Sequence, residues 1–508
     1  MDEAHKTHYG LKILEKRDTL RADDEFDAMP VNILHAIPLY ISRQLGWGDF
    51  VVHGHSGLVR NLLFPSEDFP IWMAGRMATV VLSLLLGAYI FRWSRALYGV
   101  GGALLSLAVF VFCPNMLAHG ILTTTDMPVT SLSLISLYYF WRFLKAPGVA
   151  SFIKSSVTVG LAQIMKYTAV HLLPICLLVY VAFKWKGRRE KRHQRSLRAR
   201  RFLFVVFLYV GVVVTVIHFG FLFQRTGRPL ESYLFKSASL QALQSELWGW
   251  SVRVPLPQAF VTGIDQCNYY SKPPHYYSTN FYLLGEIQNT PDRKGWWHYF
   301  LMAFLLKMPT ATLVLISMCF WLWVWRGFRL SEGELFLLIP ATYFFLNFSL
   351  FLHSQPGFRY ILPMLPFLYI WLGQLVHSNR VRPFCVSVLC VWLVVSTLSF
   401  YPYFVPYFNE SIGYRKNAYL YLSDTNLQWN QGWAFKKKWL AEHPGVIENP
   451  EGISTGLLLV DTDFVTGVWD PPRFRWLREN YKPVDHVAYE YLLYRIPPGE
   501  SENNDRSP

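Results

Sequence analysis

The acidic residues that we consider as candidates for removing a proton lie at two places in the sequence. Asp2 and Glu3 follow the first methionine, and Asp126 ends the polar stretch TTTD. A carboxylate can act as a general base toward an attacking hydroxyl group. Structural interpretations are also open, because Asp2 and Glu3 suit a solvated terminus and Asp126 suits the N-cap of a helix that begins at Met127.

Three cationic side chains lie at the ends of apolar segments or just inside them. They are Lys166, Lys307 and Arg359. Such groups hold the charge of a departing phosphate, and with a carboxylate base they suit the attack of an acceptor hydroxyl on a sugar C1. A single base and direct displacement would invert the anomeric carbon. Lys166 and Arg359 also suit side chains that snorkel to a membrane surface.

Other polar residues in the same regions are candidates for contacting a substrate. These residues are His119, His353, Asn409, Glu410, Asp424 and Asn426. A metal site would use Asp2 and Glu3 with His5 and His8, but their spacing matches no compact metal motif. We therefore predict no metal ligands and no certain cofactor, and a divalent cation stays possible.

The composition indicates that these residues are positioned by membrane helices. Charged residues make up 16% of the 508 and hydrophobic residues 52%, whereas soluble domains have about 25% charged residues. Ten segments approach the length of about 20 residues that crosses a bilayer. They are residues 71–91, 99–118, 127–144, 151–166, 168–184, 202–221, 299–325, 333–352, 360–377 and 384–401.

Basic residues orient these spans. Lys184–Arg201 contains ten Lys or Arg and one Glu between two apolar segments, which is typical of a cytoplasmic loop. Counting spans from this loop places five basic clusters on the cytoplasmic side and every candidate site residue on the other side. The placement of the basic residues behind the net charge of +14 therefore indicates the orientation of the spans, and no nucleic-acid partner is expected.

The predicted domains alternate between the membrane and its outer face. Residues 1–70 form a first extracytoplasmic loop with the acidic pair and juxtamembrane helices, and residues 34–47 lie along the membrane surface. The remaining parts are transmembrane helices 71–221 with the basic loop 184–201, an extracytoplasmic loop 222–298, transmembrane helices 299–401 and an extracytoplasmic region 402–508. In the last region, 456–465 and 486–496 are predicted strands and 471–480 a helix, which together make a small α/β lobe.

Four collinear motifs give the sequence a family resemblance. They are the pair Asp2–Glu3, PNMLAHGILTTTDMP at 114–128, GWWHYFLMAFLLKMP at 295–309, and PGFRYILPMLPFLY at 356–369 followed by YFNE and YLSDTNLQWNQG. The chain resembles membrane glycosyltransferases of the GT-C fold. The most similar group is glycosyltransferase family 39, with its dolichyl-phosphate-mannose–protein mannosyltransferases and aminoarabinose transferases.

The resemblance implies an all-α polytopic fold and transfer of a sugar from a polyprenyl-phosphate carrier. The acceptor would be a protein, lipid or glycan at the outer face of a membrane, with the bacterial inner membrane as the expected location. It implies that Asp2 is the catalytic base, with Glu3 and Asp126 as further acidic residues. Lys166, Lys307 and Arg359 become candidates for the carrier phosphate.

Two departures from the family pattern affect these expectations. The acidic pair of the family follows a transmembrane helix, so we expect one helix upstream of Met1 in addition to the ten spans. Gln428 stands where the family often has Asp. A polytopic transporter or lipid flippase is the alternative function, although its ionisable residues would lie near the bilayer midplane. A catalytically inactive membrane scaffold is a third possibility.

Overall fold

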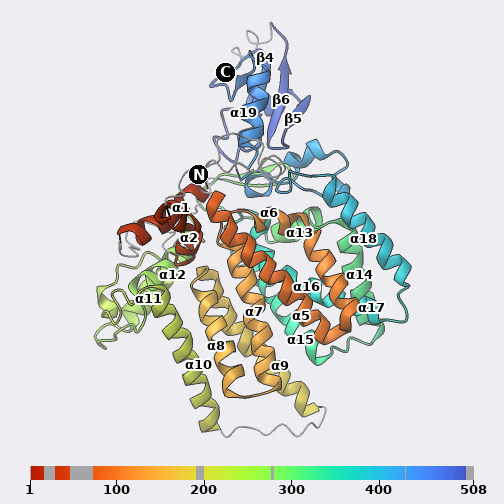
Figure 1. Ribbon diagram of the computed structural model, residues 1–508. Helices are drawn as coiled ribbons and strands as arrows, with labels where there is room; N and C mark the ends of the chain where they lie inside the picture. Colours follow the sequence, from red (N-terminus) through yellow and green to blue (C-terminus); the bar gives the residue numbers. More distant parts are fainter. Residues whose placement is uncertain are drawn as a thin grey trace.

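The computed structural model describes residues 2–16, 29–45, 73–189, 199–275, 280–429 and 431–498. A bundle of long helices forms the body of the molecule, and a small lobe near the C-terminus lies at one end of it (Figure 1). We call this end the lobe end. The opposite end, where the helix that ends at Arg189 and the helix that begins at Ala199 lie, is the basic end.

Helices account for most of the described residues. The first part of the chain contains α1 (Asp2–Lys16), α2 (Val31–Gln44), α5 (Met73–Val111), α6 (Pro114–Gly120), α7 (Asp126–Lys145), α8 (Val149–Gln163), η1 (Tyr167–His171), α9 (Leu172–Arg189) and α10 (Ala199–Gly220). The middle contains η2 (Leu230–Ser232), α11 (Ala238–Glu246), α12 (Gln258–Tyr270), β1 (Phe281–Leu283), β2 (Glu286–Gln288), α13 (Tyr299–Lys307), α14 (Thr310–Trp325) and α15 (Glu332–Phe351). The last part contains η3 (Phe358–Met364), α16 (Leu365–Leu372), α17 (Gln374–His377), α18 (Pro383–Leu398), η4 (Glu410–Ile412), η5 (Arg415–Leu420), η6 (Asp424–Asn426), α19 (Trp433–Glu442), α20 (Thr462–Thr466) and α21 (Arg475–Asn480).

The chain is an integral, multi-pass membrane protein with a mainly helical fold. Five helical stretches in the described part are long and apolar enough to cross a membrane, and the bent pair α13–α14 is a sixth candidate. The shorter α18 is apolar as well. The ten predicted spans are all largely helical where the structure describes them, although several differ from a single straight helix.

Two of these differences have clear local causes. The spans predicted at 71–91 and 99–118 begin as two successive helices within α5 that meet at Gly99, where φ is 71°, and the second span continues past the end of α5 into α6. The span predicted at 299–325 is bent by 112° between α13 and α14. Pro309 restricts Met308 to an extended conformation, with φ −80° and ψ 135°, so the helix ends at Lys307. Lys307 therefore lies at the end of α13, at the bend of the predicted span.

The C-terminal lobe has the predicted α/β composition with different boundaries. Its sheet has the order β3-β4-β6-β5, where β3 is Ile447–Glu448 and β4 is Gly456–Asp461. The strand predicted at 456–465 ends at Asp461 because α20 follows at once. The segment predicted as one strand at 486–496 is split into β5 (Asp485–Val487) and β6 (Tyr491–Ile496), which are antiparallel. The predicted helix at 471–480 is shortened to α21.

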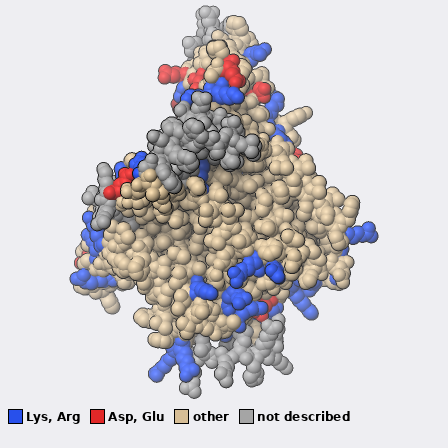
Figure 2. Space-filling model, viewed as in Figure 1, with Lys and Arg blue, Asp and Glu red and all other residues tan. Residues whose placement is uncertain are grey.

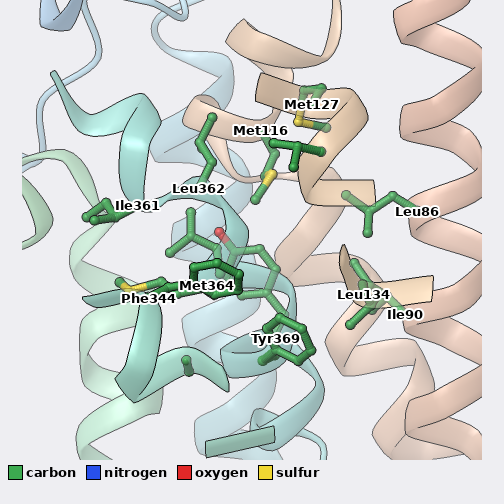
Figure 3. Packing of buried hydrophobic residues seen from close by; sticks show 14 of the residues in the cluster. Leu86, Ile90, Met116, Met127, Leu134, Phe344, Ile361, Leu362, Met364 and Tyr369 are labelled. Carbon is green, nitrogen blue, oxygen red and sulfur yellow. The ribbon is translucent and has the colours of Figure 1, made fainter. Parts of the chain in front are cut away.

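Residues that closely follow Asp126 and Arg359 in sequence belong to the core of the bundle. Met127 comes after Asp126, and Leu362 follows Arg359 by three residues; both are buried with Met116 of α6 (Figure 3). Below them Tyr369 of α16 is fully buried and donates a hydrogen bond to Cys113 Sγ at 3.0 Å. Between membrane helices, close van der Waals packing of this kind stabilises the arrangement. The core therefore fixes the positions of α7 and η3, and with them the positions of the polar residues at the starts of these two helices.

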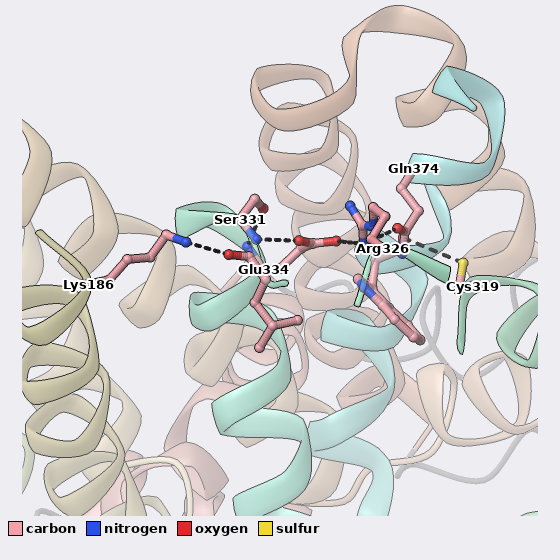
Figure 4. Close-up of polar contacts among 8 residues, drawn as sticks. Lys186, Cys319, Arg326, Ser331, Glu334 and Gln374 are labelled. Atoms are coloured by element: carbon pink, nitrogen blue, oxygen red, sulfur yellow. Dashed lines mark hydrogen bonds and ion pairs between the residues drawn. The ribbon is translucent and has the colours of Figure 1, made fainter. Parts of the chain in front are cut away.

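Basic side chains of several helices meet at the basic end, as the orientation prediction requires. Arg326 donates to Glu334 Oε1 at 2.7 Å and to Gln374 Oε1 at 2.9 Å (Figure 4). Lys186 donates to the Leu330 carbonyl, and Ser331 and Glu334 form a capping box at the start of α15. In Figure 2, Lys and Arg gather along the lower part of the body, whereas its central surface is largely uncharged.

We predict that Glu334 requires Arg326 for stability, because the Glu334 side chain is 1% exposed. Arg326→Ala leaves a buried carboxylate without its cation, which should lower the free energy of unfolding by about 1–3 kcal/mol. Adding Glu334→Gln removes that charge and should restore part of the loss. Thermal unfolding of the purified protein in detergent measures both effects, with the exposed Arg329→Ala as control. A double variant less stable than Arg326→Ala would contradict this role.

Candidate functional site

Asp126 is the centre of a buried ion cluster at the lobe end. Its side chain is 2% exposed, and Oδ1 accepts a hydrogen bond from Lys166 Nζ at 2.5 Å. Arg359 Nη1 lies 3.5 Å from Oδ2. The N-cap of α7 is Thr125 and makes no side-chain capping bond. The Asp126 carboxylate therefore serves two cations, and the capping interpretation of this residue was wrong.

Local backbone structure brings the two cations to Asp126. Lys166 follows the end of α8 in an extended conformation, with φ −161° and ψ 142°, immediately before η1. Arg359 lies at the start of η3, after Gly357 with a φ of 135°. A Cβ atom at Gly357 would come 2.2 Å from Thr425 Oγ1. The glycine therefore permits the turn that presents Arg359 beside the 423–429 segment.

Aromatic rings enclose the two cations. Lys166 Nζ lies 4.7 Å from the centroid of the Tyr360 ring, and Arg359 Cζ lies 4.2 Å from that of Trp429. Their side chains are 18% and 17% exposed. Cation–π contacts and partial burial hold charged groups in place while leaving surface open to an incoming anion.

His119 lies next to this cluster. It belongs to α6, is 5% exposed, and is within electrostatic range of Asp126 and Arg359. Burial lowers the pKa of His119 to about 4, so the imidazole is neutral at pH 7. Its Nδ1 has no hydrogen-bond partner among the described residues. A neutral imidazole with a buried nitrogen is suited to a hydrogen bond with a substrate.

Glu3 binds to the same turn that carries Asp126. Arg76 of α5 donates to both Glu3 oxygens, at 3.0 and 2.7 Å, and the Thr123 amide donates to Oε1 at 2.7 Å. The bidentate geometry joins α1 to α5 and to the residues just before α7. Asp2 is the first residue of α1, but its side chain lies outside the described part of the structure. Glu3 therefore places the backbone of Asp2 close to the turn.

Lys307 and Asn426 connect the bundle to the segment after α18. Lys307 is 2% exposed and donates from Nζ to the carbonyls of Val405 and Asn426. Asn426 donates to the Tyr299 hydroxyl at 2.9 Å and accepts from the Phe358 amide at 2.9 Å. These hydrogen bonds hold the turn before Arg359 in place. Lys307 thus contacts backbone carbonyls, not the carboxylate of Asp126.

The other candidate residues have hydrogen-bond partners outside the Asp126 cluster. Asn409 donates to the carbonyls of Leu305 and Met308, at the end of α13. Glu410 accepts hydrogen bonds from Thr310, Trp392 and Ser396, which links α14 to α18. His353 contacts the carbonyl of Lys294 at 3.3 Å. These contacts give Asn409 and Glu410 a clear structural role.

A lobe residue that the motifs did not indicate holds the 423–429 segment. Asp463 of α20 accepts from Ser423 Oγ at 2.8 Å, from the Asp424 amide at 2.9 Å and from Gln428 Nε2. Burial raises the pKa of Asp463. The same segment presents Trp429 to Arg359, so the lobe supports the ion cluster through Asp463.

Arg76 and Tyr360 were also absent from the sequence-based candidates. Arg76 lies near the start of a long apolar run. A cation at such a position indicates a carboxylate partner, and this signal could have identified Arg76. Tyr360 follows Arg359 directly and reads as an ordinary aromatic residue. Among the side chains that the structure describes, no three His, Cys, Asp or Glu residues are grouped so that they could hold a metal ion.

We predict that Asp463→Ala loosens the segment that carries Trp429. Hydrogen–deuterium exchange of a peptide covering 421–432 should become faster, because three hydrogen bonds to the segment are lost. Asp463→Asn should remain near the wild-type rate, because the amide oxygen can keep both Oδ1 bonds and the Gln428 amide can rotate. Glu451→Ala, at an exposed lobe carboxylate, is the control. Equal exchange in the Ala and Asn variants would contradict this explanation.

Comparisons with known proteins agree with the resemblance that the motifs predict. Residues 64–218 match the sequence model of the family described as dolichyl-phosphate-mannose-protein mannosyltransferase, and no curated protein matches the chain. The matched region includes the turn with Asp126 and also Lys166.

Two crystal structures of ArnT from Cupriavidus metallidurans are also similar. The apo structure is 14% identical with a TM-score of 0.45, and the similarity covers 79% of this chain and 66% of that one. The structure bound to undecaprenyl phosphate is 12% identical with a TM-score of 0.46, and it covers 97% and 93%. Over residues 64–218 the chain is thus similar to the mannosyltransferase family, which confirms the predicted resemblance there.

Proposed function

We propose that this protein transfers a sugar from a polyprenyl-phosphate carrier to an acceptor hydroxyl at the membrane surface. The observation that carries the proposal is the convergence of Lys166 and Arg359 on Asp126 at the lobe end. The family matched by residues 64–218 is described by a dolichyl-phosphate-mannose donor, which supports this class of substrate.

The two cations are suited to the phosphate of the carrier. Lysine has three N–H donors and arginine five, so an anion can share them with the single Asp126 carboxylate. Asp126 keeps the cations in place when the carrier is absent, because burying them without a counter-charge is unfavourable. When the bond from C1 to the phosphate oxygen breaks, the phosphate takes the electron pair, and the cations stabilise the charge that develops.

The attacking hydroxyl requires a base on the opposite side of the sugar ring. Asp2 is our candidate for this role, since Glu3 holds α1 against the turn that carries Asp126. The Glu3 carboxylate already accepts from Arg76 and Thr123, which makes it a positioning residue. As the acceptor oxygen bonds to C1, its proton passes to the base and the configuration at C1 inverts.

The remaining features of the proposal concern partners and location. We propose a protein, lipid or glycan acceptor that approaches from the lobe end. The basic residues at the opposite end support a cytoplasmic position for that end, by the positive-inside rule. The site would then face outward, with a bacterial plasma membrane as the location. His119 lies beside the cations and would contact the donor sugar or its phosphate.

We predict that Lys166→Ala weakens binding of a polyprenyl monophosphate to the purified protein. Loss of one charge-assisted hydrogen bond, about 1.5–3 kcal/mol, corresponds to a rise in Kd of about 10-fold to 150-fold. The matched control is Lys154→Ala, since Lys154 is exposed on α8, the helix that ends shortly before Lys166. Binding that is unchanged in Lys166→Ala, with the protein folded, would contradict the phosphate site.

We predict different effects for neighbouring acidic residues of α1. Asp2→Asn should lower sugar transfer by about 10²-fold to 10⁴-fold without reducing the amount of folded protein, because it removes the base. Glu3→Gln should reduce the amount of folded protein, because it weakens the contact with Arg76. Mass spectrometry of glycans and glycolipids from cells carrying each variant measures transfer. Glu15→Gln, at the far end of α1, is the control.

Normal transfer in well-folded Asp2→Asn would exclude this residue as the base. Failure of Asp2→Asn to fold would be distinguished by measuring the yield of monodisperse protein. In that case Asp2→Glu, which keeps the carboxylate, should restore folding together with a fraction of transfer.

A further inference from the structure

A second surface at the lobe end has a character that the proposed reaction does not explain. Residues 221–256 follow α10 directly and include η2 and α11; we call them the α11 loop. The loop has a small core of its own, in which Leu230, Tyr233 and Phe235 are buried. The rings of Tyr233 and Phe235 stack with centroids 5.3 Å apart. The segment is therefore a folded unit with a defined outer face.

That outer face is unusually apolar. Leu234 is 92% exposed, Trp250 77% and Trp248 64%. The exposed large apolar side chains of the loop are Leu222, Phe223, Leu234, Leu243, Trp248 and Trp250. Isolated exposed apolar residues are normal, but a group of this size in one short segment marks a contact surface.

The surface continues a face that contacts lipid. Only 11% of the apolar window of α10 is buried inside the protein, and Phe207 and Phe219 are 73% and 66% exposed. α10 has the length and composition of a membrane span, so this face is turned to lipid. Leu222 and Phe223 come two and three residues after its end. Figure 1 shows α11 at the height of the lobe-side end of α10.

Polar residues of the loop have the pattern of a membrane interface. Arg228 donates to Gln258 Oε1 at 2.6 Å, and Arg253 donates to the Gly227 carbonyl at 3.2 Å. Arg225 is exposed nearby and also contacts Gln258. Tryptophan is enriched at this depth because the indole ring is amphipathic, and an arginine guanidinium there can act as an anchor to lipid phosphates.

We propose that the α11 loop lies in the headgroup region of the membrane at the lobe end, with Leu234, Trp248 and Trp250 in contact with lipid. The occupant of this surface is the phospholipid leaflet that surrounds α10. The loop is thus a second, non-spanning attachment to the membrane.

This attachment bears on the depth of the ion cluster. The loop leads into α12, and Tyr167 at the start of η1 donates to the Ala259 carbonyl at 3.3 Å. A Cβ at Gly263 would lie 2.0 Å from the Tyr167 ring, so α12 and η1 are in close contact. Lys166 is the residue before Tyr167. Lipid contact at the α11 loop therefore fixes the height of Lys166 relative to the membrane surface.

Photolabelling in lipid nanodiscs tests the proposal on the whole protein. A phospholipid with a diazirine near the headgroup is activated, and labelled peptides are identified by mass spectrometry. Peptides containing Leu234, Trp248 and Trp250 should carry several times more label than the peptide with Trp469, a lobe residue that is 50% exposed. Labelling of the loop at the low level of Trp469 would overturn the proposal.

Oxidative footprinting in water is the complementary measurement. Trp248 and Trp250 should be modified more slowly than Trp469 in nanodiscs. If Trp248 and Trp250 react as fast as Trp469 in the wild-type protein, the face is open to water. That result would reject lipid contact and leave the surface to a protein partner.

Discussion

The buried carboxylate of Asp126 is the constraint on which the lobe end depends. It is 2% exposed, and a charge at that depth is stable only with partners in place. Lys166 comes from the turn between α8 and η1, and Arg359 from the start of η3. One carboxylate therefore fixes the relative positions of three segments that are far apart in sequence, and it keeps two cations arranged before any anion binds.

Further contacts hold the segments that carry this ion cluster in place. On one side Glu3 joins α1 to Arg76 and to the turn before Asp126. On the other, Asp463 of the lobe holds the segment that places Trp429 against Arg359. Lys307 supports the same segment through the Asn426 carbonyl. The lobe is thus part of the support of the site, not an independent appendage.

Much of the fold and part of the site were predictable from sequence. Apolar runs predicted the helices, because the length and hydrophobicity of a segment act locally. The bend at Met308 was missed although Pro309 signals it, since the run is continuously apolar. The meeting of Asp126 with Lys166 and Arg359 required the family motifs, because no local pattern brings such distant residues together. The role of Asp463 could be predicted neither from local patterns nor from the family motifs, because it depends on how the lobe packs against the 423–429 segment.

The most direct test of the central claim is a structure of the protein in lipid nanodiscs with a polyprenyl monophosphate. The account predicts phosphate density within hydrogen-bonding distance of Lys166 Nζ and the Arg359 guanidinium, with Asp126 still facing both. Phosphate density at another place, with the Asp126 cluster unchanged, would contradict it.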